Sequence, residues 1–295
     1  MQPQMNKTVL MSGAEYFDDG QAINPFMDSA QVVDVARAIA EHTQLRETLE
    51  SIGVTVVKTA APPDLQDGVY TANWALVRGD KAVLSSLPPS RCGEQRYAEE
   101  ALKKLGKRVY TVPNDRKFSG QGDALPCGNY LFCGSGYRTD PEVHPYLAET
   151  LGYEVMTLRT IPQIDKTGNP VTNPVSGWAD SYFYDLDLAL SVLRFPAAEQ
   201  KGLIAWCPEA FMPESRDTLA NFGGVEKIEV SFAEAKEAFA CNLVSTGSTV
   251  VMSANAPELR AAIEAHGLQT ITLSMPELAK GGGFIRCTTL TLDNE

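Results

Sequence analysis

The sequence predicts an α/β fold in which a short unit repeats along the chain. Strand-like runs rich in β-branched residues are separated by segments whose apolar residues recur at helical spacing. Three of these helical segments end in a glycine directly before a β-rich run, at Gly106, Gly152 and Gly267. The order strand–strand–helix–strand therefore recurs. Repeated short units favour a propeller or another pseudosymmetric array over two unlike domains.

Local signals place the individual elements of this repeat. The dipeptides Gly-Asp at 79–80 and Gly-Asn at 128–129 each join two strand-like runs, which predicts hairpins there. Asp140 is expected to be the N-cap of a helix whose first residue is Pro141. The predicted strands cover 7–12, 54–60, 69–80, 81–86, 108–113, 153–161, 248–254 and 268–275, with paired strands over 124–134. The predicted helices cover 29–53, 91–106, 140–152, 231–247 and 256–267, and segments 182–193, 203–211 and 287–293 continue the series.

The whole chain, 1–295, is expected to form a single domain, because no linker rich in Pro and Ser separates its halves. One connection, residues 161–180, is too long for an ordinary loop. Loops of this length are either lids over a functional site or mobile segments, and the sequence is compatible with both readings.

Charge excludes several classes of function. The 295 residues carry a formal net charge of −12, whereas binding to nucleic acid needs clustered Lys and Arg. An anionic membrane would repel such a chain, and no apolar run is long enough to span a bilayer. A small cationic ligand is compatible with this charge. The oligomeric state is not predicted.

Cysteine and histidine usage argues against metal and disulfide sites. The six cysteines form no CxxC pair and only three histidines are present, so neither a zinc site nor a disulfide scaffold is expected. The first ten residues contain no basic segment followed by an apolar run, so reduced thiols in a cytoplasm are the expected state. No metal or organic cofactor is predicted.

Seven segments resemble the pentein superfamily, which contains the dimethylarginine dimethylaminohydrolases, arginine deiminases and amidinotransferases. They are INPFM at 23–27, VYTANWALV at 69–77, FSGQGDAL at 118–125, GYRTD at 136–140, YDLDLALSVL at 184–193, CPEAF at 207–211 and KGGGFIRCTTL at 280–290. They follow the family's order over nearly the whole chain. The resemblance implies a five-fold pseudosymmetric α/β propeller with its active site in the central channel. It also implies a hydrolase acting on a guanidino compound, with amidino transfer as the alternative reaction.

The resemblance implies that Cys287 is the nucleophile, which attacks the guanidinium carbon and forms a covalent intermediate. The glycine run 281–283 before it lets the backbone approach a ligand closely. A thiolate is a strong nucleophile once its pKa is lowered. The other five cysteines are expected to be buried structural residues; they are Cys92, Cys127, Cys133, Cys207 and Cys241.

Four further positions match residues that bind substrate in the family. Asp187 matches a carboxylate that holds the guanidinium group by charge-assisted hydrogen bonds. Asn73 lies where many relatives carry an aspartate, and it can accept a hydrogen bond without contributing charge. Arg91 and Arg138 resemble arginines that hold the substrate's α-carboxylate. The alternative interpretations are a surface aspartate, a turn asparagine and two surface arginines.

Two more residues are expected near the site. Asp123, in the GQGD sequence, is expected to shape the site rather than to react. Phe26, in the 23–27 segment, either covers the ligand or packs in the core.

The chain departs from the family at its general acid/base. The catalytic histidine of the family is replaced by Asp185, and the acidic residue that orients that histidine is matched by Ser119. Two facing acids would raise one pKa strongly, whereas Ser119 removes that conflict and can donate a hydrogen bond to Asp185. With a raised pKa, Asp185 could take over the acid/base role. The alternatives are a non-catalytic pentein that binds a cationic guanidino ligand and a purely structural protein on the same fold.

The motifs predict that Cys287, Asp185, Asp187 and Asn73 converge on one central, acidic pocket. The three histidines lie in helical segments elsewhere and are expected on the surface; they are His42, His144 and His266.

Overall fold

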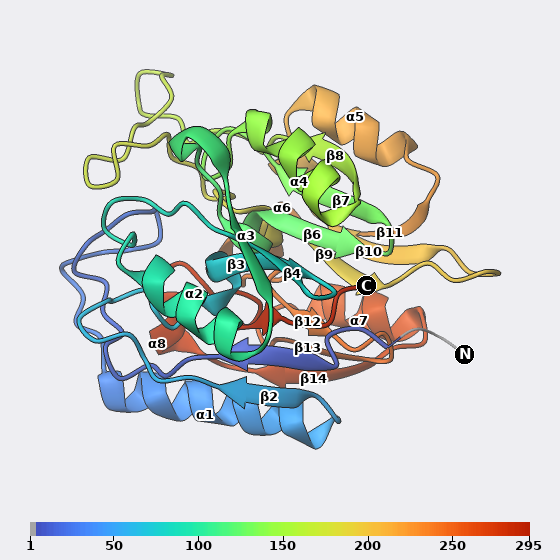
Figure 1. Cartoon of the computed structure of the whole chain (residues 1–295). Coiled ribbons are helices and arrows are strands. Elements are labelled where there is room, and N and C mark those ends of the chain that lie inside the picture. The colour runs from blue at the N-terminus through green and yellow to red at the C-terminus, as the bar shows by residue number, and fades with distance from the viewer. Residues whose placement is uncertain (1–3) are drawn as a thin grey trace.

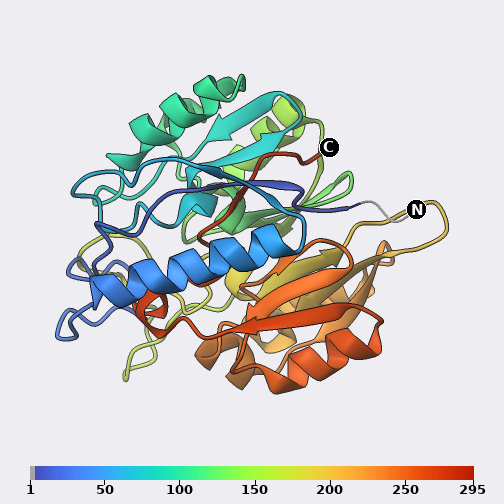
Figure 2. The same cartoon turned by 90° about the horizontal axis from the view of Figure 1, so that it is seen from below.

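Five three-stranded sheets surround a common centre in the computed structural model, which describes residues 4–295 (Figure 1, Figure 2). The strands are β1 (Thr8–Met11), β2 (Thr55–Lys58), β3 (Ala75–Arg78), β4 (Lys81–Leu84), β5 (Arg108–Thr111), β6 (Ala124–Cys127), β7 (Tyr130–Gly134), β8 (Glu154–Leu158), β9 (Leu190–Arg194), β10 (Gly202–Trp206), β11 (Val225–Glu229), β12 (Val244–Ser245), β13 (Thr249–Ser253), β14 (Gln269–Leu273) and β15 (Leu290–Thr291). The α-helices are α1 (Val35–Ser51), α2 (Glu94–Lys104), α3 (Gly120–Asp123), α4 (His144–Leu151), α5 (Pro213–Asn221), α6 (Phe232–Glu237), α7 (Pro257–Ala265) and α8 (Pro276–Ala279).

All five sheets have the same topology, which confirms the predicted repeat. Their orders are β15-β1-β2, β3-β4-β5, β6-β7-β8, β9-β10-β11 and β12-β13-β14. In each sheet the first pair is antiparallel and the second pair is parallel. Parallel neighbours need a crossover, which the peripheral helices α1, α2, α4, α5 and α7 supply. The fold is thus a five-fold pseudosymmetric α/β propeller.

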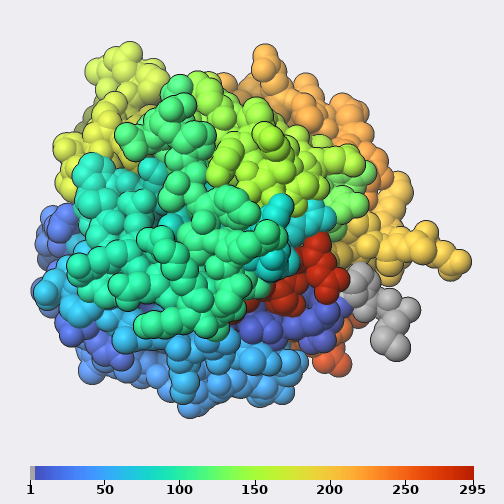
Figure 3. Space-filling model, in the orientation of Figure 1, coloured from blue at the N-terminus to red at the C-terminus, as the bar shows by residue number. Residues whose placement is uncertain are grey.

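The two ends of the chain close the ring. Strand β15 near the C-terminus pairs with β1 near the N-terminus, so the first sheet exists only when both ends come together. Leu292 N–H donates to Thr8 O, and Gly79 N–H donates to Asn294 O. In Figure 3 the red C-terminal residues accordingly lie between the blue N-terminal strand and the cyan hairpin of β3 and β4.

Burial falls from the centre of the ring to its edge. The first strand of each sheet is almost wholly buried, and the first strands of neighbouring sheets contact one another, as β6 does β9 and β9 does β12. The third strands are partly exposed, as in β2 and β5. The segments that enter the first strands are therefore the ones that reach the centre.

The structure corrects the predicted bounds of two helices. The first helix begins at Val35 rather than at residue 29, because the Asp34 side chain accepts from Arg37 N–H and caps it there. Of the predicted helix 231–247, only Phe232–Glu237 is helical. The chain turns at Phe239, where φ is 53°, and then forms β12 against β13.

Other local predictions hold in part. Gly106, Gly152 and Gly267 all have positive φ, as expected after helix ends. The first half of the predicted strand 69–80 is instead the buried 3₁₀ turn η1 (Thr71–Trp74). Asp140 is the N-cap residue of the 3₁₀ turn Pro141–Val143 that leads into α4, with Pro141 at its first position as predicted, but its carboxylate accepts from Lys117 N–H and makes no capping hydrogen bond. Helix α5 and strand β11 were not predicted.

Residues 161–180 form a projecting, yellow-green loop at the upper left of Figure 1. Its Asn173 donates to the backbone oxygen of Ala22, which ties it to the segment before α1. Across residues 4–295, no helix combines the length and the apolar character that a membrane span needs.

Candidate active site

Five turns, one from each repeat, meet at the centre of the propeller. Each turn directly precedes the first strand of its sheet; the turns are 71–74, 119–123, 185–188, 239–243 and 284–289. Hydrogen bonds link them across the centre, because Asn73 reaches Ser119 and Asp185 while Cys287 reaches Asp187 and Asn242. The repeat thus brings residues more than two hundred positions apart into contact.

Cys287 is 3% exposed and is held from several sides. Its Sγ lies 3.5 Å from Asp187 Oδ2 and 3.1 Å from Asn242 Nδ2. Its backbone N–H donates to Asn242 Oδ1 at 3.1 Å. At Gly283 an added Cβ would lie 2.9 Å from the Cβ of Cys287 and 2.6 Å from the ring of Tyr70, so this position has room only for glycine.

Asp185 is buried in a network of neutral donors. Asn73 Nδ2 donates to its Oδ2 at 2.7 Å and to Ser119 Oγ at 2.9 Å. The Ser119 side chain lies beside Asp185 and opposes the rise in the pKa of that carboxyl. Asp185 Oδ1 is buried and has no hydrogen-bond partner within residues 4–295. Asp123 supports the turn from behind, because its Oδ1 accepts from Leu186 N–H at 3.0 Å.

Burial raises the pKa of the three aspartates in the central turns, Asp123, Asp185 and Asp187. The pKa values of Asp123 and Asp187 are raised well above the ordinary range by burial and by repulsion from Asp185. Burial also raises the pKa of Asp185, while the positive charge of Arg138 opposes the rise. The pKa of the Cys287 thiol lies well above its usual value because of burial and of the neighbouring Asp187. In the free protein the thiol is therefore mainly protonated.

A hollow opens beside Cys287 and forms the candidate substrate pocket. Most of the predicted site residues line it: Asn73, Arg91, Arg138, Asp185 and Cys287. The predicted excess of acidic residues is wrong, because two arginines and two carboxylates, Asp185 and Asp67, line the pocket together. Burial raises the pKa of Asp67 to about 7, although Arg91 opposes the rise.

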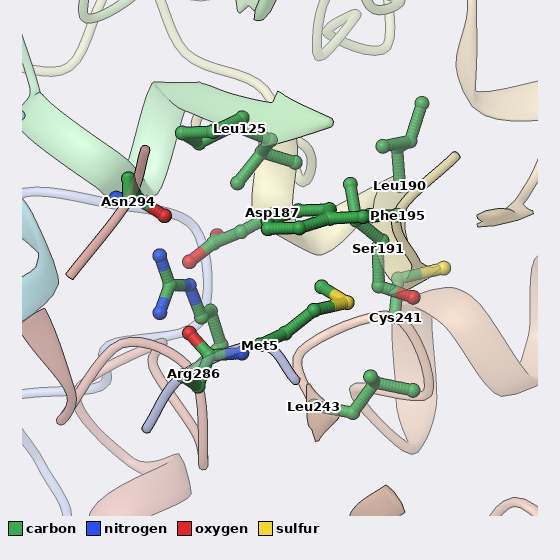
Figure 4. Close-up of a pocket in the computed structure, with 13 residues that line it drawn as sticks. Met5, Leu125, Asp187, Leu190, Ser191, Phe195, Cys241, Leu243, Arg286 and Asn294 are labelled. Carbon is green, nitrogen blue, oxygen red and sulfur yellow. The ribbon is translucent and has the colours of Figure 1, made fainter. Parts of the chain in front are cut away.

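Asp187 does not line this hollow. It lies behind Cys287 and lines a neighbouring hollow, where its carboxylate points towards the guanidinium of Arg286 (Figure 4). Three of the four residues predicted to converge therefore share one pocket, and the fourth contacts the thiol from the other side.

The two arginines differ in the donors that they leave free. Arg91 is paired with Glu94 through Nε and Nη2, at 2.8 and 2.9 Å, and its Nη1 donates to Asn73 Oδ1 at 3.0 Å. Arg138 donates to the backbone oxygen of Ile23, while its Nε has no partner within the described residues. Arg138 is thus the pocket arginine whose guanidinium keeps a donor without a partner among residues 4–295.

Phe26 lies outside the set of residues that line the pocket. It is half-buried and packs on Phe239 and Tyr182, with ring centroids 4.8 and 5.4 Å away. This is the core packing that was one of its two predicted roles.

Two residues at the site were missed in the sequence. Asn242 lies in a segment whose apolar spacing predicts helix, and that assignment concealed it. Asp67 lies in a segment, 61–68, whose composition predicts only a turn. A carboxylate in a Gly- and Pro-containing turn next to a family motif was the one available signal for Asp67.

Three expectations about residues away from the site are wrong. Cys92 is exposed, because it lies at the start of α2 rather than in the core. His42 and His144 are buried, since each faces inward from its helix, whereas His266 is exposed as expected.

Within residues 4–295 no group of three or more His, Cys, Asp and Glu is arranged to hold a metal ion.

Comparison with known proteins relates this architecture to enzymes of arginine chemistry. The family profile described as eukaryotic N,N dimethylarginine dimethylhydrolase matches residues 16–172. The N(G),N(G)-dimethylarginine dimethylaminohydrolase of Mycobacterium tuberculosis is 32% identical over 96% of this chain and 84% of its own length. The bifunctional arginine dihydrolase/ornithine cyclodeaminase AgrE of a Nostoc species is 32% identical over 95% of this chain. The match covers only 37% of AgrE, so the chain spans little more than a third of that protein.

A solved structure has the same fold. The N-terminal domain of ArgZ, a cyanobacterial arginine dihydrolase, has been solved with its substrate in a cysteine-to-serine variant. It superposes with a TM-score of 0.82 at 27% identity and covers 97% of this chain and 98% of its own. An asparagine-to-serine variant of that domain carries a covalently bound reaction intermediate.

Proposed function

Because this chain belongs to the dimethylarginine dimethylaminohydrolase family, we propose that it hydrolyses a C–N bond of a guanidino compound through a covalent intermediate on Cys287. One observation carries the proposal: Cys287 lines a pocket that also contains a carboxylate, Asp185, and an arginine, Arg138, whose Nε has no partner among residues 4–295. These are a nucleophile, a partner for a guanidinium cation and a partner for a carboxylate. A guanidino amino acid such as arginine carries both of the groups that they would bind.

The charges at the site favour a cationic ligand. Asp185 Oδ1 is a buried carboxylate oxygen that has no donor among the described residues 4–295, and a guanidinium N–H would supply one. Asp187 approaches the thiol from behind, so its charge also attracts a cation bound on the pocket side of Cys287. A bound cation stabilises the thiolate against both carboxylates, so the nucleophile ionises mainly when the substrate is present.

In the proposed reaction Asp185 replaces the missing histidine by carrying one proton. It takes the proton of the Cys287 thiol, the thiolate attacks the guanidinium carbon, and a C–S bond forms. Asp185 then gives that proton to the leaving nitrogen, the C–N bond breaks and ammonia or an amine departs. The raised pKa of Asp185, caused by burial, suits a carboxyl that must donate near neutral pH.

Water completes the cycle. Asp185 accepts one proton of the attacking water, whose oxygen bonds to the carbon of the thiouronium intermediate. The C–S bond then breaks, the sulfur recovers a proton from Asp185, and a urea-type product leaves as one proton passes to solvent. In amidino transfer an amine would attack in place of water, so the choice of acceptor decides between the two reactions.

We further propose that loop 161–180 braces the entrance of the pocket rather than closing it. Residues of this loop do not line the hollow, but Ile23 and Asn24 do. The loop holds their segment through the hydrogen bond from Asn173 to Ala22, and its Trp178 lies against the Arg138 guanidinium at 5.6 Å. Trp178→Ala should raise KM without abolishing turnover.

Intact-mass spectrometry tests the proposed function. The protein is incubated with arginine, dimethylarginine and smaller guanidino compounds, followed by an acid quench. We expect a covalent adduct that disappears in Cys287→Ser. The non-catalytic alternative is favoured by the absence of the family's histidine, and it predicts binding without adduct or product.

The double variant Asp185→His with Ser119→Glu rebuilds the family's acid/base pair. If the natural protein is inactive towards every compound and this variant hydrolyses one, the natural site is a binding pocket rather than an enzyme.

A further inference from the structure

We infer that Asn242 is a further catalytic residue, whose side-chain amide donates a hydrogen bond to the sulfur of Cys287 and stabilises its thiolate. The inference rests on the proposed nucleophilic role of Cys287. Asn242 would thereby perform one function of the family's histidine, which is to stabilise the negatively charged sulfur.

The geometry of Asn242 permits only one orientation of its amide. The backbone N–H of Cys287 is a donor, so the atom 3.1 Å from it must be the amide oxygen. The amide nitrogen is then the atom 3.1 Å from Sγ, and its N–H points at the sulfur. Asn242 is completely buried, so water does not compete for either contact.

The other groups around the sulfur disfavour a thiolate or are engaged elsewhere. Asp187 and Asp185 are anionic when ionised, and the Tyr70 and Tyr184 hydroxyls donate to the backbone oxygens of Leu278 and Gly282. The guanidinium of Arg286 donates to Gln121, Thr289 and Thr291. Among residues 4–295, Asn242 is the side chain that donates a hydrogen bond to this sulfur.

The repeat explains why an asparagine lies there. Asn242 precedes β12 by two residues, and Asn73 precedes β3 by two residues. Each amide thus enters the centre from the equivalent position of its own unit. Asn73 donates to Asp185, and Asn242 donates to Cys287, so each proposed reactive side chain is held by one asparagine.

The contact also fits the chemistry of the cycle. The sulfur is negative immediately before the C–S bond forms and again as that bond breaks. A donor that stays in place at both moments lowers both barriers without moving a proton itself. In line with this contact, the hydrogen bond from Asn242 opposes the rise in the pKa of the Cys287 thiol.

Alkylation of Cys287 by iodoacetamide tests the inference without any guanidino substrate. The rate is followed by intact mass from pH 6 to 10, in a Cys92→Ser background that removes the exposed thiol. For Asn242→Ala we expect the rate at a given pH to fall about ten- to a hundredfold, the usual range for a hydrogen bond to a charged group. Asn294→Ala is the matched control, because Asn294 is a buried asparagine that donates to Val77 O, and its rate should not change.

Asn242→Asp distinguishes a side chain that donates a hydrogen bond to the sulfur from one that only fills the space beside it. It keeps the oxygen that accepts from Cys287 N–H and replaces the amide N–H by a second oxygen. Stabilisation of the thiolate predicts alkylation at least as slow as in Asn242→Ala, with the pH profile moved to higher pH. Alkylation at the natural rate in Asn242→Asp, or in a folded Asn242→Ala, would overturn the inference.

The result is independent of the proposed function. If guanidino compounds form no adduct but the alkylation profile still depends on Asn242, the function is wrong and the inference stands. If an adduct forms and the rate of Cys287 alkylation does not depend on Asn242, the proposed function stands and the inference fails.

Discussion

Asp187→Asn should have opposite effects on the thiol and on the ligand. Asp187 Oδ2 lies 3.5 Å from Cys287 Sγ. At an effective dielectric constant of about 20, two unit charges at that separation repel by about 5 kcal/mol. Burial and repulsion from Asp185 raise the pKa of Asp187 well above its ordinary value, so its removal recovers only part of this energy.

We therefore expect Asp187→Asn to speed alkylation of Cys287 by iodoacetamide about ten- to a few-hundredfold, with about 1.4 kcal/mol for each factor of ten. The gain should grow as pH rises through the pKa of Asp187, because only the ionised carboxylate opposes the thiolate. The same variant should weaken binding of a guanidino ligand about tenfold or more, because it removes a negative charge behind the cation. Calorimetry in a Cys287→Ser background measures that loss.

Asp180→Asn is the control for this experiment. Asp180 is also a buried carboxylate whose pKa is raised by burial, but it accepts from Asn173 in the 161–180 loop. Cys287 should be alkylated in Asp180→Asn at the same rate as in the natural protein. Slower alkylation in Asp187→Asn, or no gain at any pH, would refute the view that Asp187 suppresses the thiolate in the free protein.

Three further predictions follow from other groups. Asp185→Asn should lower kcat by about a hundredfold or more with little change in ligand Kd, and an unchanged rate would remove Asp185 from the mechanism. His42 is buried, which lowers its pKa to about 4, so stability is fully present above pH 6.5 and is lost as pH falls towards 4. His42→Leu should reduce this loss of stability, which amounts to up to about 3 kcal/mol. The free energy of unfolding in urea is compared at pH 7 and pH 4.5. An equal loss in the natural protein and in His42→Leu would contradict the prediction. Arg91→Lys should lower Tm and kcat, because lysine cannot hydrogen-bond Glu94 and Asn73 at the same time as arginine does. A tenfold rise in KM at unchanged Tm would instead mean that Arg91 binds substrate.

Much of the propeller was predictable because its units obey local rules. Glycines with positive φ end three of its helices, and turn dipeptides join two of its hairpins. Prediction failed where tertiary pairing overrides local pattern. Residues 238–247 have helical spacing, yet β13 recruits Val244–Ser245 as a strand, and the pairing of several backbone groups outweighs a weak helical preference.

By itself, the sequence determined that this is a repeated α/β protein and that Cys287, Asp185 and Asn73 belong together, since ordered motifs carry that information. Only the tertiary structure decided that Asn242 holds the sulfur, that Glu94 engages Arg91, and that Asp187 lies behind the thiol rather than in the pocket. The physical reason lies in the architecture. Periodicity reveals which face of a segment is buried, but the partner of a buried polar group comes from another of the five units. That partner becomes defined only when the ring closes.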